Sequence, residues 1–263
     1  MIARFSSLTA GMAVVLSASG ALAQEAAVQA NAALPAAGVG STFGMAGTLA
    51  LGADRLFGYT HSIVKVEDEQ PAPIGTVTIT NTVDTISLLG KTPFSTGQFG
   101  SPYSTPRLGI DFFVIDNLSI GGSLTYVSES GEGETEGAGQ SVSADLDSSS
   151  GFLISPRVGF GMMFNEAIGI WPRGGITFFT VSTERKDNTG ATTSEVSLNG
   201  LALTVEVPFI LSPADHVAIT LGPTLDFPLS GSSEVDPAGP TPSTEIDVKI
   251  TDIGLNAGLL TWF

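Results

Sequence analysis

Near its C-terminus the chain has apolar residues at every second position. Counting back from Phe263, these alternate positions hold Thr261, Leu259, Ala257, Leu255 and Ile253, and the residues between them are mostly small or polar. A two-residue period puts one set of side chains on each face of a β-strand. An apolar face that ends on an aromatic residue is costly in water and favourable against lipid. The pattern therefore predicts a strand that faces a membrane.

The same alternation recurs along the chain and predicts an all-β fold with eight strands. We expect these strands at residues 47–66, 103–114, 118–129, 151–164, 167–183, 195–211, 217–229 and 245–263. The mean hydropathy is positive, yet no segment after the first residues is apolar enough for a spanning helix. Apolar residues spread over alternating strands give this combination in a transmembrane barrel, so we predict an eight-stranded antiparallel up-and-down β-barrel.

The connections between these strands alternate strictly between long and short. The chain has Lys+Arg 10 against Asp+Glu 26, a formal net charge of −16, and the acidic residues concentrate in four segments rich in Gly, Ser and Pro: 67–70, 129–150, 184–195 and 230–245. We expect these to be long extracellular loops and the short connections to be periplasmic turns. The first long loop runs to about residue 101 and contains a β-like run at 76–80. Nucleic acid is not expected as a partner, because phosphate binding needs clustered Lys and Arg.

The N-terminus is typical of an exported protein. Arg4 supplies a positive charge, a short apolar stretch follows, and Ala21-Leu22-Ala23 matches a cleavage site. We expect a signal peptide at 1–23, a flexible Ala-rich segment at 24–46 and the barrel at 47–263. Since Cys is 0, neither a disulfide nor a thiolate site can form.

The polar rows of the strands distinguish a membrane barrel from a soluble β-sandwich. A sandwich would place Lys, Glu, Thr and Gln on its water-facing row. Here that row is mostly Gly, Ala, Ser and Thr, which suit a narrow barrel interior. The first strand fits least well, since Arg55 falls on the outer row unless a β-bulge turns it inward.

Single charges on the inner rows form a candidate network in the lumen. Its members are Asp54, Asp111, Glu206, Asp226 and Asp252 with Arg107, Arg157 and Arg173. Opposite charges in a narrow lumen should pair, because an unpaired charge there is costly. The network could act as a gate or ligand site, or as a structural plug. An eight-stranded interior is only just filled by side chains, which favours the plug.

Taken together, the strand rhythm, the loop alternation and the terminal Phe263 resemble the small eight-stranded outer-membrane barrels of the OmpA and OmpX type. The resemblance covers residues 47–263 and implies a location in the outer membrane of a Gram-negative bacterium. It implies contact with outer-membrane lipid and lipopolysaccharide, and it implies that the barrel assembly machinery reads Phe263 as an assembly signal. No peptidoglycan-binding domain is expected after Phe263.

The resemblance defines a function only coarsely. We expect a non-enzymatic barrel with a structural or surface-interaction role, and the alternatives are a narrow channel or carrier for small or hydrophobic solutes and a lipid-A-modifying hydrolase. His61, beside Ser62 and Tyr59, is the only available base for a hydrolase, and no catalytic residue is assigned. No cofactor or metal site is assigned either. Acidic loop residues could nevertheless bind divalent cations or bridge them to lipopolysaccharide phosphates: Glu132, Glu134, Glu136, Asp145 and Asp147.

Overall fold

The computed structural model describes residues 42–70, 75–88, 101–137, 140–187 and 190–263. All of them belong to one compact unit, Ser41–Phe263. The expected signal peptide and most of the Ala-rich segment lie outside the described residues. Within the described part, no helix is long and apolar enough to cross a membrane.

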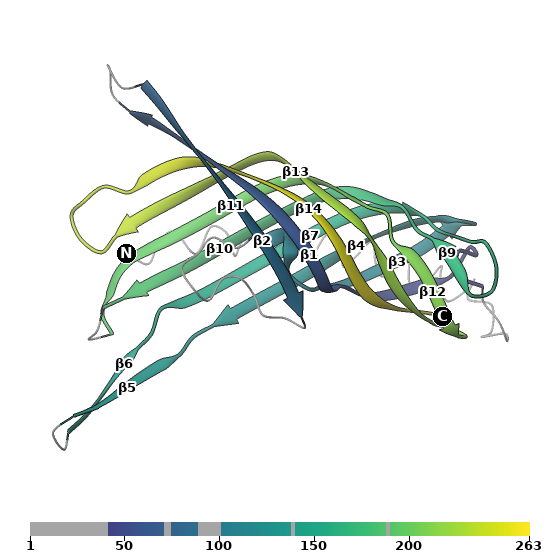
Figure 1. Cartoon of the computed structure of the whole chain (residues 1–263), viewed down its shortest axis with the longest axis horizontal. Helices are drawn as coiled ribbons and strands as arrows, with labels where there is room; N and C mark the ends of the chain where they lie inside the picture. The colour runs from purple at the N-terminus through teal and green to yellow at the C-terminus, as the bar shows by residue number, and fades with distance from the viewer. Residues whose placement is uncertain (1–41, 71–74, 89–100, 138–139, 188–189) are drawn as a thin grey trace, which may run out of the picture. The chain divides into compact units, whose positions relative to one another are not determined.

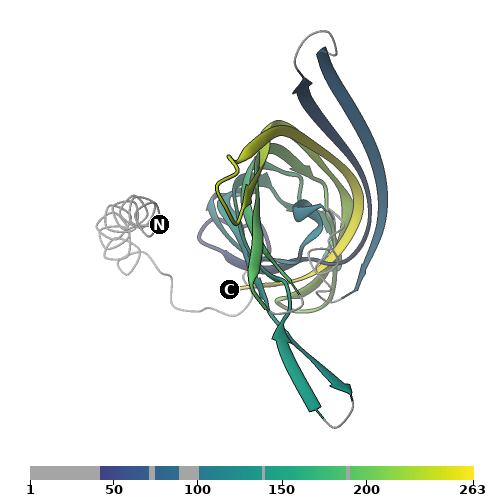
Figure 2. The ribbon, with the colours of Figure 1, turned by 90° about the vertical axis from the view of Figure 1, so that its left-hand side faces the viewer.

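Eight antiparallel strands form a closed barrel (Figures 1 and 2). Each strand pairs with its neighbour around the ring, and β11 pairs with β13 to continue the wall. The fold class predicted from the sequence is therefore confirmed. In chain order the wall strands are β1 (Leu49–Gln70), β3 (Arg107–Ile115), β4 (Leu118–Glu129), β7 (Ser148–Phe160), β10 (Arg173–Lys186), β11 (Thr192–Glu206), β13 (Val217–Pro237) and β14 (Thr244–Trp262).

Three wall strands are interrupted near the end of the barrel that carries the short turns. β7 continues as β8 (Met162–Met163), β10 is preceded by β9 (Ile168–Ile170), and β11 continues as β12 (Phe209–Ala214). One break falls at Gly161. The other two fall at Trp171-Pro172 and at Val207-Pro208, where the proline cannot donate to the ladder. Backbone bonds from Phe160 to Pro172 and from Trp171 to Pro208 reconnect the wall.

The strands run further into the long connections than the sequence predicted. β1 extends to Gln70 and pairs along its outer half with β2 (Gly75–Leu88), which contains the β-like run at 76–80. Likewise β5 (Glu132–Gly137) and β6 (Gln140–Asp145) form a hairpin inside the predicted loop 129–150. Much of 184–195 and 230–245 is also strand. The loop assignments were wrong here because polar and acidic residues are tolerated in strands that face water on both sides.

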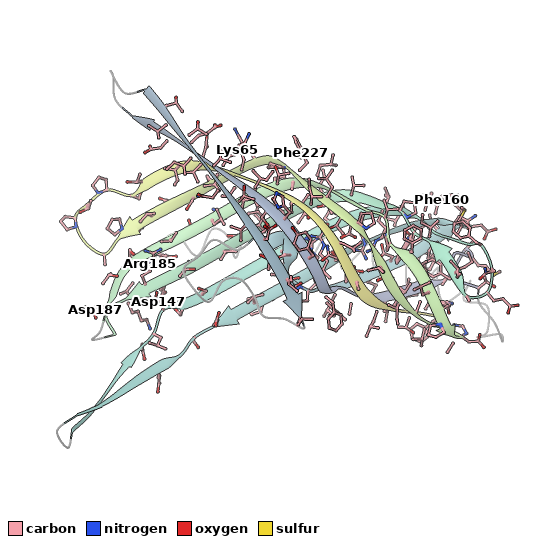
Figure 3. All side chains as sticks on the ribbon, in the orientation of Figure 1. Lys65, Asp147, Phe160, Arg185, Asp187 and Phe227 are labelled. Carbon is pink, nitrogen blue, oxygen red and sulfur yellow. The ribbon has the colours of Figure 1, made fainter. Side chains whose placement is uncertain are left out.

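The predicted outer rows do face outward. Leu108, Ile110 and Phe112 on β3 are 67%, 54% and 43% exposed, and the alternate residues of β3 are buried. The same alternation runs along β13, and Phe160 and Phe227 both point away from the barrel (Figure 3). An uncharged apolar band on a closed barrel is what contact with the lipid core requires.

Candidate functional site in the barrel interior

An aromatic cluster fills the lumen at the short-turn end. Phe43 lies 5.0 Å from Phe113, 5.2 Å from Trp171 and 5.5 Å from Trp262, measured between ring centroids in edge-to-face arrangements. All four rings are buried, and Ile210 packs beside them. Phe43 comes from the segment 24–46 that the sequence assigned to a flexible lead-in, so the last residues of that segment contribute to the barrel interior.

Arg157 holds two carboxylates at the next level of the lumen. Its Nη2 lies 2.6 Å from Asp111 Oδ2, and its Nε also donates to Asp111. Its Nη1 lies 2.7 Å from Asp54 Oδ2. Such forked guanidinium contacts fix the geometry of both partners. All three side chains are buried, so the ion pairs cross the lumen between β3, β7 and β1.

Arg173 links the same carboxylate to a second acidic residue. Its Nη2 lies 3.1 Å from Asp54 Oδ1 and 2.8 Å from Glu206 Oε2. The guanidinium also stacks over the ring of Trp171 at 4.6 Å, a cation–π contact that ties the charged level to the aromatic cluster below it. The charged level and the aromatic cluster therefore form one continuous filling.

Arg55 belongs to this network although the alternation had placed it on the outer row. Between Ala53 and Phe57 the chain advances four positions on β1 against two on β14, which is a β-bulge. Arg55 has a φ of 57° there, a conformation that a non-glycine residue adopts only under constraint. Its side chain points inward, with Nη2 2.9 Å from Glu206 Oε1 and Nη1 2.8 Å from Asp226 Oδ2.

Arg107 and Asp252, both predicted members, lie inside the barrel but make no ion pair in the described part of the chain. Arg107 Nη2 donates to the carbonyl oxygen of Tyr103 at 2.8 Å. Asp252 accepts a hydrogen bond from the Ser101 hydroxyl. Tyr103 belongs to a short 3₁₀ turn, η2 (Pro102–Ser104), which is fully buried in the lumen, and Ser101 is the N-cap of that turn. The sequence had assigned this turn to the start of a strand.

Small inner-row residues make room for the arginine side chains. A Cβ on Gly109 would lie 2.5 Å from Arg157 Nη2 and 2.9 Å from Asp54 Oδ2. A Cβ on Gly159 would lie 2.6 Å from Nε1 of Trp171. The glycines of the polar rows therefore have a packing role.

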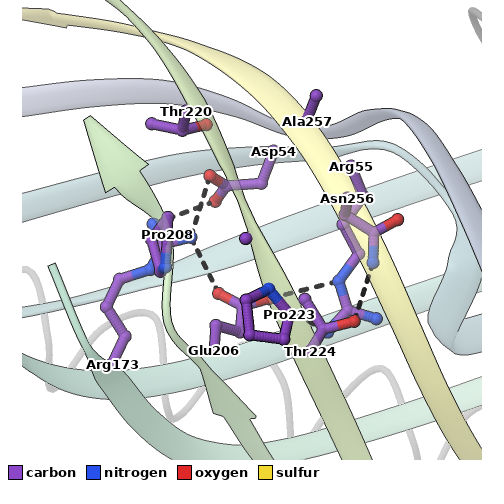
Figure 4. A pocket seen from close by; sticks show the side chains of 11 residues that line it. Asp54, Arg55, Arg173, Glu206, Pro208, Thr220, Pro223, Thr224, Asn256 and Ala257 are labelled. Carbon is purple, nitrogen blue, oxygen red and sulfur yellow. Dashed lines mark hydrogen bonds and ion pairs between the residues drawn. The ribbon is translucent and has the colours of Figure 1, made fainter. Parts of the chain in front are cut away.

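The space left within the charged level is very small. A cavity of about 20 Å³ is lined by charged and polar side chains, among them Asp54, Arg55, Arg173, Glu206, Thr224 and Asn256 (Figure 4). That volume suits about one water molecule. This cavity has no room for a larger solute.

Beyond η2, toward the long-loop end, the lumen is lined by apolar side chains. Tyr103 packs edge-to-face on Phe179 with 5.1 Å between ring centroids. Further buried members of this upper cluster are Val64, Leu153, Val181, Leu198, Val248 and Ile250. The interior thus has three levels: an aromatic cluster, a charged belt and an upper apolar cluster.

His61 and Tyr59, considered above as part of a hydrolase site, lie on the outer face of β1. His61 Nδ1 is 2.8 Å from Asp84 Oδ1 on β2, and Tyr59 donates to the same oxygen at 2.6 Å. These hydrogen bonds, first from Tyr59 and then from His61, hold the pKa of Asp84 below its ordinary range. Ser62 is buried and faces the lumen, on the opposite face of β1 from His61.

The acidic residues of the long connections are spread apart where they are described. Asp145 forms an ion pair with Lys186 at 3.0 Å, and Asp147 accepts from the Lys186 backbone at 2.7 Å. Among the described residues no group of three or more potential metal ligands comes together. The side chains of Glu134 and Glu136 lie outside the description.

Phe263 is 64% exposed and lies on the outer face of the wall. Its backbone exchanges two hydrogen bonds with Leu49, at 3.0 and 3.1 Å. The residue therefore closes the β14–β1 junction through its backbone, while its ring faces outward.

No protein-family model and no curated protein matches the chain. Solved structures do match. The outer membrane protein OprG from Pseudomonas aeruginosa aligns with a TM-score of 0.50 at 11% identity, over 83% of this chain and 97% of that one. The outer membrane protein AlkL aligns with a TM-score of 0.43 at 11% identity, over 87% and 96%. Neisserial surface protein A aligns with a TM-score of 0.38 at 10% identity, over 82% and 98%.

The chain is a small outer-membrane β-barrel. The closed ring of eight strands, the uncharged outer band and the likeness to OprG agree on this fold. The resemblance stated from the sequence is confirmed, and so is the location in the outer membrane of a Gram-negative bacterium. In that location the outer rows of this barrel contact lipid.

Proposed function

We propose that the protein is a closed, non-conducting barrel that holds β-hairpins at the cell surface. The observation that carries this proposal is the charged belt. Three guanidinium groups, on Arg55, Arg157 and Arg173, form buried ion pairs with four carboxylates, on Asp54, Asp111, Glu206 and Asp226. Arg107 donates to the carbonyl of Tyr103. Both sides of this belt are packed with apolar side chains.

A filled lumen supports a structural role over a channel role. An ion that crossed the belt would have to separate buried ion pairs and then pass two apolar levels, each of which penalises a bare charge. Past the outer band, β1 pairs with β2, and the connection between β4 and β7 forms the β5–β6 hairpin. Both hairpins project from the barrel (Figures 1 and 2). The positions of Ser62 and His61 on opposite faces of β1 also argue against a Ser–His hydrolase.

The test is the conductance of the full chain in a planar bilayer. We expect no steady current from the unmodified protein, with a porin in the same bilayer as the positive control. Insertion is verified beforehand by the faster migration of the folded barrel on an unheated gel. Large, stable single-channel currents from the unmodified protein would refute the closed lumen and favour the channel alternative.

The upper apolar cluster favours a second candidate, the uptake of hydrophobic solutes. β3 pairs with β4 only as far as Leu124, and beyond it Thr125 Oγ1 bonds to the Pro106 carbonyl. In the described residues the edge of β4 at 125–129 pairs only with β7, while the outer half of β1 pairs with β2 instead of β3. Among the described residues the wall is thus discontinuous between β2 and β4, and an apolar solute could pass there between the lumen and the lipid.

This second candidate predicts binding of an apolar fluorophore such as N-phenyl-1-naphthylamine by the folded barrel. Val181→Asn, inside the upper cluster, should weaken that binding, whereas Ile176→Asn on the outer row of the same strand should not. Equal binding by both variants and the unmodified protein would exclude the upper cluster as the site.

A further inference from the structure

An open groove lies on the outer wall near the long-loop end. Its volume is about 370 Å³. Phe178, Leu201 and Leu229 supply its apolar part, and Asn199, Ser230, Ser232, Asp247 and Lys249 supply its polar part. The groove therefore has one apolar and one polar region.

The groove forms where β13 departs from regular pairing. Against β14 the register shifts between Asp226 and Ser232, and against β11 it shifts beside Leu229. Pro228 lies inside this stretch and has no N–H to give to the ladder. The irregular backbone leaves a depression in the wall, and Leu229 stays 51% exposed beside it.

The groove lies where the lipid-facing rows end. Phe178 and Phe227 are 42% and 53% exposed, and Tyr59 and Tyr126 are exposed on other strands, as in the aromatic girdle of an outer-membrane barrel. On β1 the apolar row ends at Ile63 and the next outward residue is Lys65. On β14 the apolar row ends at Ile253, and the next outward residues are Thr251 and Lys249.

Two lysines face each other across β1 and β14 at this boundary. Lys65 and Lys249 are direct partners in the register, an arrangement of like charges that destabilises a sheet. Lys249 Nζ lies 3.2 Å from Glu67 Oε2, while Lys65 takes part in no ion pair among the described residues and points away from the barrel (Figure 3). In a chain with a net charge of −16, an anion between the two lysines would relieve their repulsion.

We propose that this groove binds a phosphate-bearing lipid of the outer leaflet, with its phosphate at Lys65 and Lys249 and an acyl chain along Phe178, Leu201 and Leu229. The inference rests on the outer-membrane location and does not depend on whether the lumen conducts. The hydroxyls of Ser230 and Ser232 add hydrogen-bond donors beside Lys249.

The order of charges along the wall fits this occupant. Moving outward from the apolar row, the register first pairs Lys65 with Lys249 and then Glu67 with Asp247. Phosphates lie directly above the acyl chains, at the lysine level, and cations bound to the lipid headgroups lie further out, at the carboxylate level. A soluble anion would gain nothing from the apolar part of the groove.

The test compares lipid retention by native mass spectrometry on the full folded chain in detergent. The probes are bis-phosphorylated lipid A and the same lipid A after removal of both phosphates. We expect the phosphorylated form to bind about tenfold more tightly, the gain expected from charge-assisted contacts. The double variant Lys65→Gln with Lys249→Gln should lose that preference.

Two matched variants make the outcome specific. Arg185→Gln with Lys186→Gln removes two cations at the far end of β10 and should keep the preference. Leu229→Gln should weaken the binding of both lipids equally, because it alters only the apolar part of the groove. Folding of every variant is checked by gel mobility before and after heating.

The proposal is overturned if the unmodified protein does not distinguish the two lipids, or if the Lys65 and Lys249 double variant retains the preference. Inorganic phosphate is added as a competitor. Displacement of lipid A by inorganic phosphate would identify a site for soluble anions and would equally overturn the lipid assignment. Neither result bears on the conductance measurement, so the two proposals fail separately.

Discussion

Arg157 is the residue on which most of the charged belt depends. It contacts Asp111 through Nε and Nη2 and Asp54 through Nη1. Its Cζ lies 5.9 Å from the centroid of the Trp171 ring. Arg157→Ala would leave two buried carboxylates without their main partner. We expect a loss of about 3–5 kcal/mol in the free energy of unfolding, measured by urea titration of the barrel in lipid vesicles.

Arg185→Ala is the control for this prediction, since Arg185 is exposed at the end of β10. It should change the free energy of unfolding by about 0.5 kcal/mol or less. A double variant, Arg157→Met with Asp111→Leu, should recover part of the loss because it removes a charge together with its partner. Equal stability of Arg157→Ala and Arg185→Ala would show that the belt does not support the fold.

Gly109 gives a second prediction at this scale. Gly109→Val would place side-chain atoms where Arg157 Nη2 and Asp54 Oδ2 now lie, so the ion pair must shift. We expect a loss of about 1–3 kcal/mol, typical of overpacking, in the same urea titration. Gly174→Val is the comparison, because a Cβ at Gly174 meets no atom within 4 Å. A smaller loss at Gly109 than at Gly174 would contradict this account.

Most belt residues could be predicted from the sequence, and Arg55 is the exception. The two-residue period assigns side chains to faces but does not reveal bulges. The bulge in β1 adds two residues, so the odd-numbered residues face outward both before it and after it, and the inward turn of Arg55 leaves no trace in the pattern. A hint did exist, since five inner carboxylates had only three inner arginines to pair with.

At the level of the strands, the sequence predicted the lipid-exposed parts well and the parts beyond them poorly. Inside the outer band, one face must be apolar, so the alternation is strong. Beyond it both faces of a hairpin meet water. β5 carries Glu, Gly and Thr without an apolar row, and the alternating apolar residues Val77 and Ile79 of β2 stay exposed. The buried turn η2 was assigned to the start of a strand, because nothing in its sequence shows that it folds back into the lumen.

The β14–β1 junction gives a prediction for Phe263. Phe263→Ser keeps the backbone bonds to Leu49 and removes only an outward ring, so the finished barrel should be little destabilised. We expect instead a severalfold drop in folded barrel in the outer-membrane fraction, if the assembly machinery reads this ring. Leu259→Ser, on the same outer row, is the control. Equal amounts of folded protein from both variants would contradict a role of the Phe263 ring in assembly.

In the barrel as a whole, both the interior and the outer surface change in character from the short-turn end to the long-loop end. The short-turn end is closed by aromatic rings, the middle by ion pairs and the upper part by apolar side chains. Outside, an uncharged band ends at an aromatic girdle, and lysines and then carboxylates follow. This polarity predicts one orientation in the membrane, with the hairpins toward the exterior.

That orientation can be tested with single cysteines, because the chain has Cys 0. Gly239 lies in the connection between β13 and β14, and a Cβ there meets no atom within 4 Å. Glu166 lies exposed in the short turn between β8 and β9. A membrane-impermeant maleimide should label Gly239→Cys on intact cells, and Glu166→Cys only after the outer membrane is permeabilised. The opposite result would invert the barrel. It would also place Lys65 and Lys249 at the inner leaflet, so the orientation decides which lipids the groove can meet.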